Sequence, residues 1–299
     1  MTKVAVIGCG MWGTNLVRNF HSLGALKSAC DFDENKLNKL AQELPGVAFT
    51  KNYEEILSDK EIDAVAIATP PVTHYEVAVK ALEASKNVFV EKPLTLNIAD
   101  SRKLIETARK KGLILMVGHL LLYHPSILKL KELIMAGALG DVFHLFSRRL
   151  NTGRVRREEN VLWSLAPHDI AVMLFLLDEE PVEISCVGGK YIQKEIEDVA
   201  FLTLIFSNGR VGNIHVSWLN PEKERKLMVV GSRGMAVVDE VNPNKKLVLF
   251  DKYVDPQTLQ IKGTEVQVVP VPDEEPLRAE CRHFLECVAE KKPPRLPTT

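Results

Sequence analysis

Several features are scarce in this 299-residue sequence, and each absence excludes a class of protein. The five cysteines are odd in number and none stands in a C-x-x-C pair, which argues against a disulfide scaffold, a structural zinc site and a dithiol redox site. Lys and Arg together number 38 against 39 Asp and Glu, so the basic excess typical of nucleic-acid or anionic-membrane binding is missing. We therefore expect no metal, no nucleic acid and no membrane as partners.

Long apolar stretches are also lacking. No run approaches the roughly 18 apolar residues of a membrane span, and the N-terminus has no charged segment followed by an apolar signal stretch. A composition of 46% hydrophobic and 26% charged residues is that of a globular protein, and the length suits two domains. These features predict a cytoplasmic protein with reduced thiols that acts on a small molecule.

The first 120 residues alternate short apolar runs with amphipathic segments. Apolar runs of this kind are typical of strands buried on both faces of a parallel sheet, and they occur at residues 4–7, 26–30, 64–68, 88–90 and 114–117. The segments between them carry apolar residues at helical spacing, at residues 35–43, 73–84 and 99–110. The pattern predicts a doubly wound α/β domain over residues 1–120.

The pattern changes after Gly118. Helices are expected at residues 125–135, 169–177 and 277–291, and alternating segments predict strands at residues 200–206, 210–217 and 226–230. Turn residues separate these strands, as in a hairpin-rich sheet. The sequence therefore predicts a second, α+β domain over residues 121–299, with a largely antiparallel open sheet.

A glycine-rich motif follows the first predicted strand and opens a predicted helix. It consists of Gly8, Cys9, Gly10, Met11, Trp12 and Gly13, which matches G-x-G-x-x-G in the context that dinucleotide binding requires. Gly8 allows the tight turn, Gly10 lets the backbone approach a pyrophosphate, and Gly13 lets helix and strand pack closely. The alternative is a turn that merely joins a strand to a helix.

Asp31 ends the second predicted strand, eighteen residues after Gly13. An acidic side chain in this place can accept hydrogen bonds from the adenosine ribose hydroxyls. A 2'-phosphate would be repelled there, and Phe32 and Asp33 supply no compensating cation. The sequence predicts NAD rather than NADP as the cofactor.

Lys92 follows another buried strand, between Glu91 and Pro93, and so lies at the carboxyl edge of the predicted sheet. A lysine that is partly desolvated beside a nicotinamide ring could accept the proton of a substrate hydroxyl as hydride leaves the same carbon. The alternative is an ordinary surface lysine after a strand.

Two histidines stand at expected helix starts. Thr69 and Pro70 begin a proline-rich loop that leads to His74, which we expect to contact the cofactor or the structure rather than to do chemistry. His168 is predicted at the start of an apolar helix, where the positive end of the dipole would keep the imidazole neutral as a base or a hydrogen-bond partner. A purely structural histidine is the alternative.

Five arginines lie close together in a stretch that is predicted to form a loop: Arg148, Arg149, Arg154, Arg156 and Arg157. Guanidinium groups suit phosphates and carboxylates, so Arg154, Arg156 and Arg157 are predicted to bind an anionic substrate such as a nucleotide sugar. A solvated charged face, balanced in part by neighbouring glutamates, would explain the same residues.

Together the glycine motif, the T-P-P-x-x-H segment at Thr69 to His74, the E-K-P segment at Glu91 to Pro93 and the late His168 resemble the Gfo/Idh/MocA family of oxidoreductases. The resemblance implies a Rossmann domain followed by a domain whose open sheet forms a homodimer or homotetramer. It also implies Lys92 and His168 as the catalytic pair, and cofactor contacts that include Glu91 and Trp163.

The pattern that includes Tyr123 and the arginine-rich loop is most similar to the branch that oxidises the 3-hydroxyl of UDP-linked N-acetylhexosamines, with Tyr123 as a substrate contact. The sequence departs from the family in having Ser164 where an acidic residue commonly stands four positions before the histidine. An inositol or free-aldose dehydrogenase, and an NAD-binding regulatory protein without activity, stay as alternatives.

Overall fold

A computed structural model describes residues 2–296 with the exception of residues 154 and 158. The chain forms two compact units, one built from residues up to Leu120 together with those from Glu275 onward, and the other from Leu121–Glu274. The predicted second domain of residues 121–299 therefore extends too far, because the last helix belongs to the first unit.

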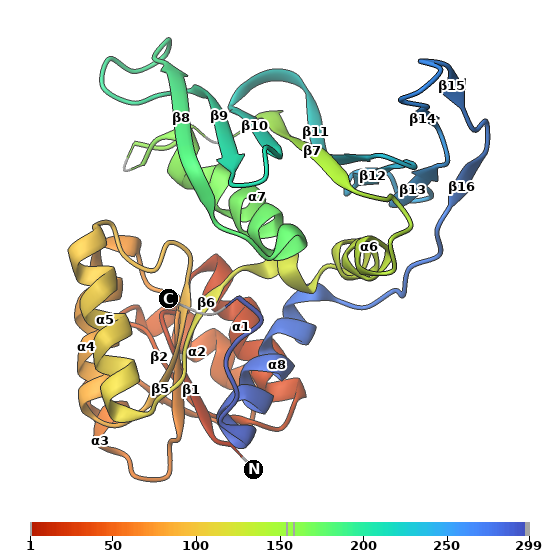
Figure 1. Cartoon of the computed structure of the whole chain (residues 1–299). Helices are drawn as coiled ribbons and strands as arrows, with labels where there is room; N and C mark the ends of the chain where they lie inside the picture. Colours follow the sequence, from red (N-terminus) through yellow and green to blue (C-terminus); the bar gives the residue numbers. More distant parts are fainter. Residues whose placement is uncertain (1, 154, 158, 297–299) are drawn as a thin grey trace. The chain divides into compact units, whose positions relative to one another are not determined.

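The first unit is built on sheet A, a six-stranded parallel sheet with the strand order β3-β2-β1-β4-β5-β6 (Figure 1). Its strands are β1 (Val4–Ile7), β2 (Leu26–Cys30), β3 (Ala48–Thr50), β4 (Ala64–Ile67), β5 (Asn87–Glu91) and β6 (Leu115–Gly118). Every residue of β1 and β4 is buried, as the short apolar runs predict. The fold class is confirmed, and the strand order reverses between β1 and β4, where open α/β sheets bind ligands.

Helices cover both faces of sheet A, with α4 and α5 on one side and α1 and α8 on the other (Figure 1). The helices of this unit are α1 (Met11–Ser22), α2 (Glu34–Glu43), α3 (Tyr53–Ser58), α4 (Pro71–Glu83), α5 (Ile98–Lys111) and α8 (Pro276–Glu290). Side chains of Asp33, Asn52 and Asn97 accept backbone N–H groups at the starts of α2, α3 and α5. These caps place each helix start directly after a strand.

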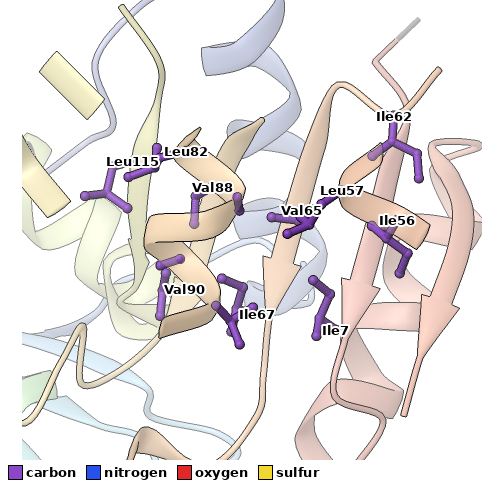
Figure 2. Close-up of a cluster of buried hydrophobic side chains, with 14 of the residues drawn as sticks. Ile7, Ile56, Leu57, Ile62, Val65, Ile67, Leu82, Val88, Val90 and Leu115 are labelled. Carbon is purple, nitrogen blue, oxygen red and sulfur yellow. The ribbon is translucent and has the colours of Figure 1, made fainter. Parts of the chain in front are cut away.

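A hydrophobic cluster fills the space between sheet A and one helix layer. Figure 2 shows its side chains from four strands and from α3 and α4, among them Ile7, Ile67, Val88, Leu57 and Leu82. Branched residues on the strands face leucines on the helices, as expected where a parallel sheet is covered by helices. The cluster makes sheet A a rigid support for the loops that follow its strands.

Helix α8 completes the opposite helix layer, although its sequence lies more than 150 residues beyond β6. The ring of Phe284 meets those of Phe20 on α1 and Phe89 on β5 edge to face, with centroids 6.3 and 5.7 Å apart. All three side chains are fully buried. Burial of this aromatic group draws α8 to the first unit, which is why the predicted domain boundary is wrong at its C-terminal end.

The second unit is built on sheet B, an eight-stranded sheet with the order β16-β13-β12-β11-β7-β10-β9-β8. Its strands are β7 (Val142–Thr152), β8 (Pro181–Gly189), β9 (Val199–Phe206), β10 (Val211–Ser217), β11 (Leu219–Gly231), β12 (Met235–Asp239), β13 (Leu247–Phe250) and β16 (Val266–Val268), and β14 (Tyr253–Val254) pairs with β15 (Ile261–Lys262) separately. Only the β10–β7 pairing is parallel among those described, so the predicted antiparallel character is confirmed.

The helices of this unit are η1 (Leu120–Tyr123), α6 (Pro125–Met135) and α7 (Val161–Leu177). Helix α7 packs against β7, β9 and β10, and α6 packs against β12. Alternate residues of β9, such as Leu202 and Leu204, are buried, while Phe201 points to the opposite face and is 54% exposed. None of the helices in the described parts of the chain is long and apolar enough to cross a membrane.

The aromatic contact of α8 yields a test of the fold. Replacing Phe284 with Ala should lower the free energy of unfolding by about 3 to 5 kcal/mol, because the substitution leaves a cavity between α1, α8 and β5. The measurement is urea unfolding followed by circular dichroism. Arg282→Ala, on the exposed side of the same helix, serves as the control and should change the value by less than about 0.5 kcal/mol. Equal effects of the two substitutions would contradict the packing role of Phe284.

Candidate active site

The glycine motif forms a cradle at the carboxyl edge of sheet A, which we define as the ends of β1, β2, β4, β5 and β6. Gly8 has φ +95°, and a Cβ atom there would lie 2.8 Å from backbone atoms of Ala68 and Thr69. A Cβ atom on Gly13 would lie 1.8 Å from the carbonyl oxygen of Gly8, so only glycine fits. At Gly10, by contrast, a Cβ would meet no atom within 4 Å. The backbone is thus open to a ligand at this one position.

The start of α1 suits an anion. The N-cap residue Gly10 offers no side-chain acceptor, and no acidic residue lies in the first turn. Backbone N–H groups at a helix N-terminus that no side chain caps can bind a phosphate, with the helix dipole in support. Met11 in this turn is 85% exposed. The cradle and the helix start therefore fit the pyrophosphate of a dinucleotide, in agreement with the motif.

Trp12 connects the cradle to the end of β5. Its indole Nε1–H donates a hydrogen bond to Oε1 of Glu91, the residue before Lys92. Burial raises the pKa of Glu91 to about 7, although the hydrogen bond from Trp12 and the charge of Lys92 oppose the shift. Two of the predicted cofactor residues are thus in direct contact, and Lys92 follows immediately at the carboxyl edge of sheet A.

Asp31 is buried and accepts hydrogen bonds from two backbone groups. The N–H of Cys9 in the glycine motif donates to Oδ2 at 2.7 Å, and the N–H of Asp33 donates to Oδ1 at 2.9 Å. The ammonium of Lys36 on α2 also lies 3.4 Å from Oδ1. Phe32 and Asp33 supply no cation here, as the sequence indicates, but Lys36, one helical turn further on, places its ammonium beside Asp31.

His74 is buried on α4 and bridges two loops of the carboxyl edge. Its Nε2 lies 2.9 Å from the carbonyl oxygen of Thr69, and its Nδ1 lies 2.7 Å from that of Pro93. Burial lowers the pKa of His74, and a neutral imidazole donates to only one of the two oxygens. Thr69 and Pro70 are thereby held beside the loop that carries Lys92, which agrees with a supporting role for His74.

Sequence reasoning did not select His119 as a site residue. Glu91 and Gly118 are paired in the register of β5 and β6, so Lys92 and His119 leave neighbouring strands at the same edge. The Nδ1 atom of His119 is buried with no hydrogen-bond partner among the described residues. Burial, and then the charge of Lys92, lowers the pKa of His119 to about 4, so the imidazole stays neutral near pH 7. Its position directly after a buried strand is the signal that could have found it.

In the second unit, α7 begins at Val161 rather than at residue 169. Asn160 is its N-cap, and the Asn160 side chain accepts the backbone N–H of Trp163. His168 thus lies in the helix interior, after Pro167, and the prediction that the helix dipole acts on it is wrong. Ser164 lies one turn before His168, on the same side of the helix. The apolar residues from 169 onward are only the second half of this helix, and Pro167 lies inside it.

The side chain of Asp169, the neighbour of His168, is buried and paired within the second unit. Its carboxylate accepts a hydrogen bond from Ser147 at 2.5 Å and pairs with the buried guanidinium of Arg149, whose Nε lies 2.8 Å from Oδ2. Arg149 also pairs with Glu240 at 2.8 Å. The two arginines 148 and 149 belong to β7, so the prediction that they lie in a loop is wrong.

The remaining predicted substrate residues differ in exposure. Arg156 and Arg157 are exposed in the segment between β7 and α7, and Arg156 pairs with Glu159 at 3.1 Å. Arg154 lies outside the described residues. Tyr123 in η1 is only 3% exposed, and Trp163 on α7 is 44% exposed. Among the described residues, no group of three or more His, Cys, Asp or Glu could hold a metal ion.

The fold and the cradle define a dinucleotide-binding protein of the Rossmann type, and comparison with known proteins gives its class. Residues 2–119 match an oxidoreductase family with an NAD-binding Rossmann fold, and residues 127–237 match the GFO/IDH/MocA C-terminal domain. The chain belongs to the Gfo/Idh/MocA family. It is an oxidoreductase.

Among the relatives is the UDP-N-acetylglucosamine 3-dehydrogenase of Acidithiobacillus ferrooxidans, 28% identical over 97% of this chain and 90% of the relative. A solved structure of that enzyme superimposes with a TM-score of 0.86 at 26% identity, over 99% of this chain and 91% of the other. The myo-inositol 2-dehydrogenase of Thermotoga maritima is also 28% identical, over 85% of this chain and 79% of the relative.

The buried carboxyl of Glu280 on α8 provides a test of how burial affects a titratable group in the first unit. Both of its carboxyl oxygens are buried without a partner among the described residues, and burial, reinforced by the charge of Glu91, raises its pKa well above 4.5. The native state therefore keeps a proton that the unfolded state releases, so the free energy of unfolding falls as the pH rises above about 4.5.

Replacing Glu280 with Gln should remove this loss. Relative to the wild type, the variant should gain stability as the pH rises from 5 to 7.5, by up to about 1.4 kcal/mol per pH unit. Urea unfolding at several pH values measures the difference. Glu290→Gln, exposed on the same helix, is the control and should show a difference that does not vary with pH. A constant difference for the Glu280 variant would show that Glu280 is ionised in the native state.

Proposed function

We propose that this protein is an NAD-dependent dehydrogenase that oxidises the 3-hydroxyl of a UDP-linked N-acetylhexosamine or a related nucleotide sugar. The observation that carries the proposal is Lys92, which follows β5 at the carboxyl edge of sheet A, directly after a residue bound to the glycine cradle. The nucleotide-sugar substrate is supported by the relative of that name, which this chain matches over nearly its whole length.

Lys92 and His168 are assigned the proton chemistry. The Lys92 amine accepts the proton of the substrate hydroxyl, and His168 orients that hydroxyl or passes the proton on. A bound nicotinamide would supply the acceptor for the hydride that leaves the same carbon. Asp169 takes no part, because Arg149 and Ser147 occupy its carboxylate.

The cofactor contacts are assigned to the carboxyl edge of sheet A. The predicted residues Gly8, Gly10, Met11, Trp12 and Gly13 hold the pyrophosphate, and Asp31 faces the adenosine ribose and favours NAD. The proposed contacts further comprise Thr69, Pro70, His74, Glu91, Lys92 and Trp163. The substrate contacts are Lys92, Tyr123, Arg154, Arg156, Arg157 and His168. The guanidinium groups of the three arginines suit a diphosphate.

Two other functions have a specific observation in their favour. An inositol dehydrogenase is favoured by the myo-inositol 2-dehydrogenase relative, which has the same 28% identity as the nucleotide-sugar enzyme over a smaller part of this chain. An NAD-binding regulatory protein is favoured by Ser164 in place of the acidic residue common in the family. A substrate panel distinguishes all three.

NADH formation over a panel of UDP-sugars, free aldoses and inositols tests the proposal. We expect turnover with a UDP-N-acetylhexosamine and at least a 1,000-fold lower kcat in Lys92→Met, since the proton acceptor is lost. NADH fluorescence should show that the variant still binds the cofactor. Turnover restricted to inositols would reassign the substrate, and bound NAD with no turnover would favour the regulatory protein.

We also propose that the open face of sheet B forms a homodimer or homotetramer interface. The face opposite α7 carries a row of paired residues from neighbouring strands, among them Phe146, Met228 and Val237. A second copy of the sheet would bury such a row, and apolar surface that is exposed in a single chain can mark a protein–protein contact.

A charge in the middle of this row tests the interface. Met228→Glu should convert the oligomer to a monomer in sedimentation velocity at micromolar concentration, because each subunit would bury a carboxylate. Met135→Glu, at an exposed position on α6, is the matched control and should leave the oligomer intact. A wild-type protein that sediments as a monomer would refute the proposed assembly, and an oligomeric Met228 variant would place the interface elsewhere.

A further inference from the structure

Lys36 is a cation at the ribose end of the proposed cofactor site that the function above does not use. It lies in the first turn of α2, and its ammonium is 3.4 Å from Oδ1 of Asp31 and 3.9 Å from Oδ2 of Asp33. The same ammonium lies 5.3 Å from the ring centroid of Phe32, which is 80% exposed. This end of the site therefore holds two carboxylates and one partly exposed cation.

Asp31 does not depend on Lys36 for its hydrogen bonds. Backbone N–H groups of Cys9 and Asp33 already donate to both of its oxygens, at 2.7 and 2.9 Å. The side chain of Lys36 is 39% exposed, whereas that of Asp31 is 5% exposed. Lys36 can consequently turn toward a ligand while the carboxylate keeps both backbone hydrogen bonds and the glycine cradle keeps its shape.

The ligand group that fits a cation in this position is a 2'-phosphate on the adenosine ribose. The phosphate monoester would bring roughly two negative charges next to two carboxylates, a repulsion that normally excludes NADP from a site with an acid at the end of β2. A lysine is a flexible point charge that binds phosphates through up to three N–H donors. The ammonium of Lys36 lies beside the carboxylates of Asp31 and Asp33, which are the groups that would repel the phosphate.

We propose that Lys36 binds the 2'-phosphate of NADP and thereby determines how strongly the protein discriminates between NADP and NAD. The proposal rests on the cofactor site of the proposed function. NAD needs only Asp31 at its ribose, so its affinity is independent of Lys36. NADP binds with lower but measurable affinity because Lys36 leaves its ion pair with Asp31 and neutralises part of the phosphate charge.

The experiment compares the dissociation constants of NADH and NADPH by cofactor fluorescence in the full-length wild type, Lys36→Met and Lys39→Met. Lys39 is exposed on the same helix and its replacement removes the same charge. We expect Lys36→Met to weaken NADPH about 10-fold, as for the loss of one charge-assisted hydrogen bond, and to change NADH less than 2-fold. Lys39→Met should change neither by more than 2-fold.

Competition with adenosine fragments, which lack the nicotinamide, tests whether the loss of NADPH affinity arises at the ribose phosphate. The fragment 2',5'-ADP should displace NADH less well from Lys36→Met than from the wild type, whereas 5'-AMP should displace it equally from both. An unchanged NADPH-to-NADH ratio in Lys36→Met, an equal loss in Lys39→Met, or no NADPH binding by the wild type would each overturn the inference while NADH binding persists. If the wild type bound neither dinucleotide, the proposed function itself would fail.

Discussion

The contact between α1 and β1 at the two glycines is the constraint on which the nucleotide cradle depends. A Cβ atom at Gly13 would lie 1.8 Å from the Gly8 carbonyl oxygen, and one at Gly8 would press on the backbone after β4. Because no side chain stands between them, the start of α1 lies directly over the end of β1 and its free N–H groups face the carboxyl edge. The cofactor residues assigned to the end of β1 and the start of α1 are placed by this contact.

The two units treat buried charge in opposite ways. In the second unit, Arg149 is neutralised by Asp169 and Glu240 and the arrangement is fully hydrogen-bonded, so the pair fixes β7 against α7 at little net cost. In the first unit, burial of Glu91 outweighs its hydrogen bond from Trp12 and the charge of Lys92, and Glu280 has no hydrogen-bond donor among the described residues, so the pKa values of both carboxyls are raised. The unfavourable burial lies directly under the loop that carries Lys92, where a site tolerates strain that a core does not.

Periodicity alone predicted most of the elements because burial on two faces and burial on one leave different patterns. The run Val4–Ile7 is a strand as expected, and the helix Pro125–Met135 has the predicted ends. Helix α7 begins eight residues before its predicted start, because Asn160 caps it and the helix continues through Pro167. Local signals identify helix ends only when no stronger cap precedes them.

Some residues of the candidate site could be predicted from local sequence features, and others could not. Strand ends and glycines are local features, so Gly8 to Gly13, Asp31 and Lys92 could be selected from sequence. Lys36 and Glu280 could not, because their importance comes from neighbours that a helical turn or a helix from the far end of the chain supplies.

The sequence by itself determined the class of fold, the order of its strands' apolar runs and the presence of a nucleotide cradle, because each follows from side-chain periodicity or from backbone freedom within a few residues. Only the tertiary structure decided that α8 belongs to the first unit, that Asp169 pairs with Arg149, and which charges surround Asp31. Those outcomes depend on the competition of distant segments for one buried surface, and no local pattern encodes that competition.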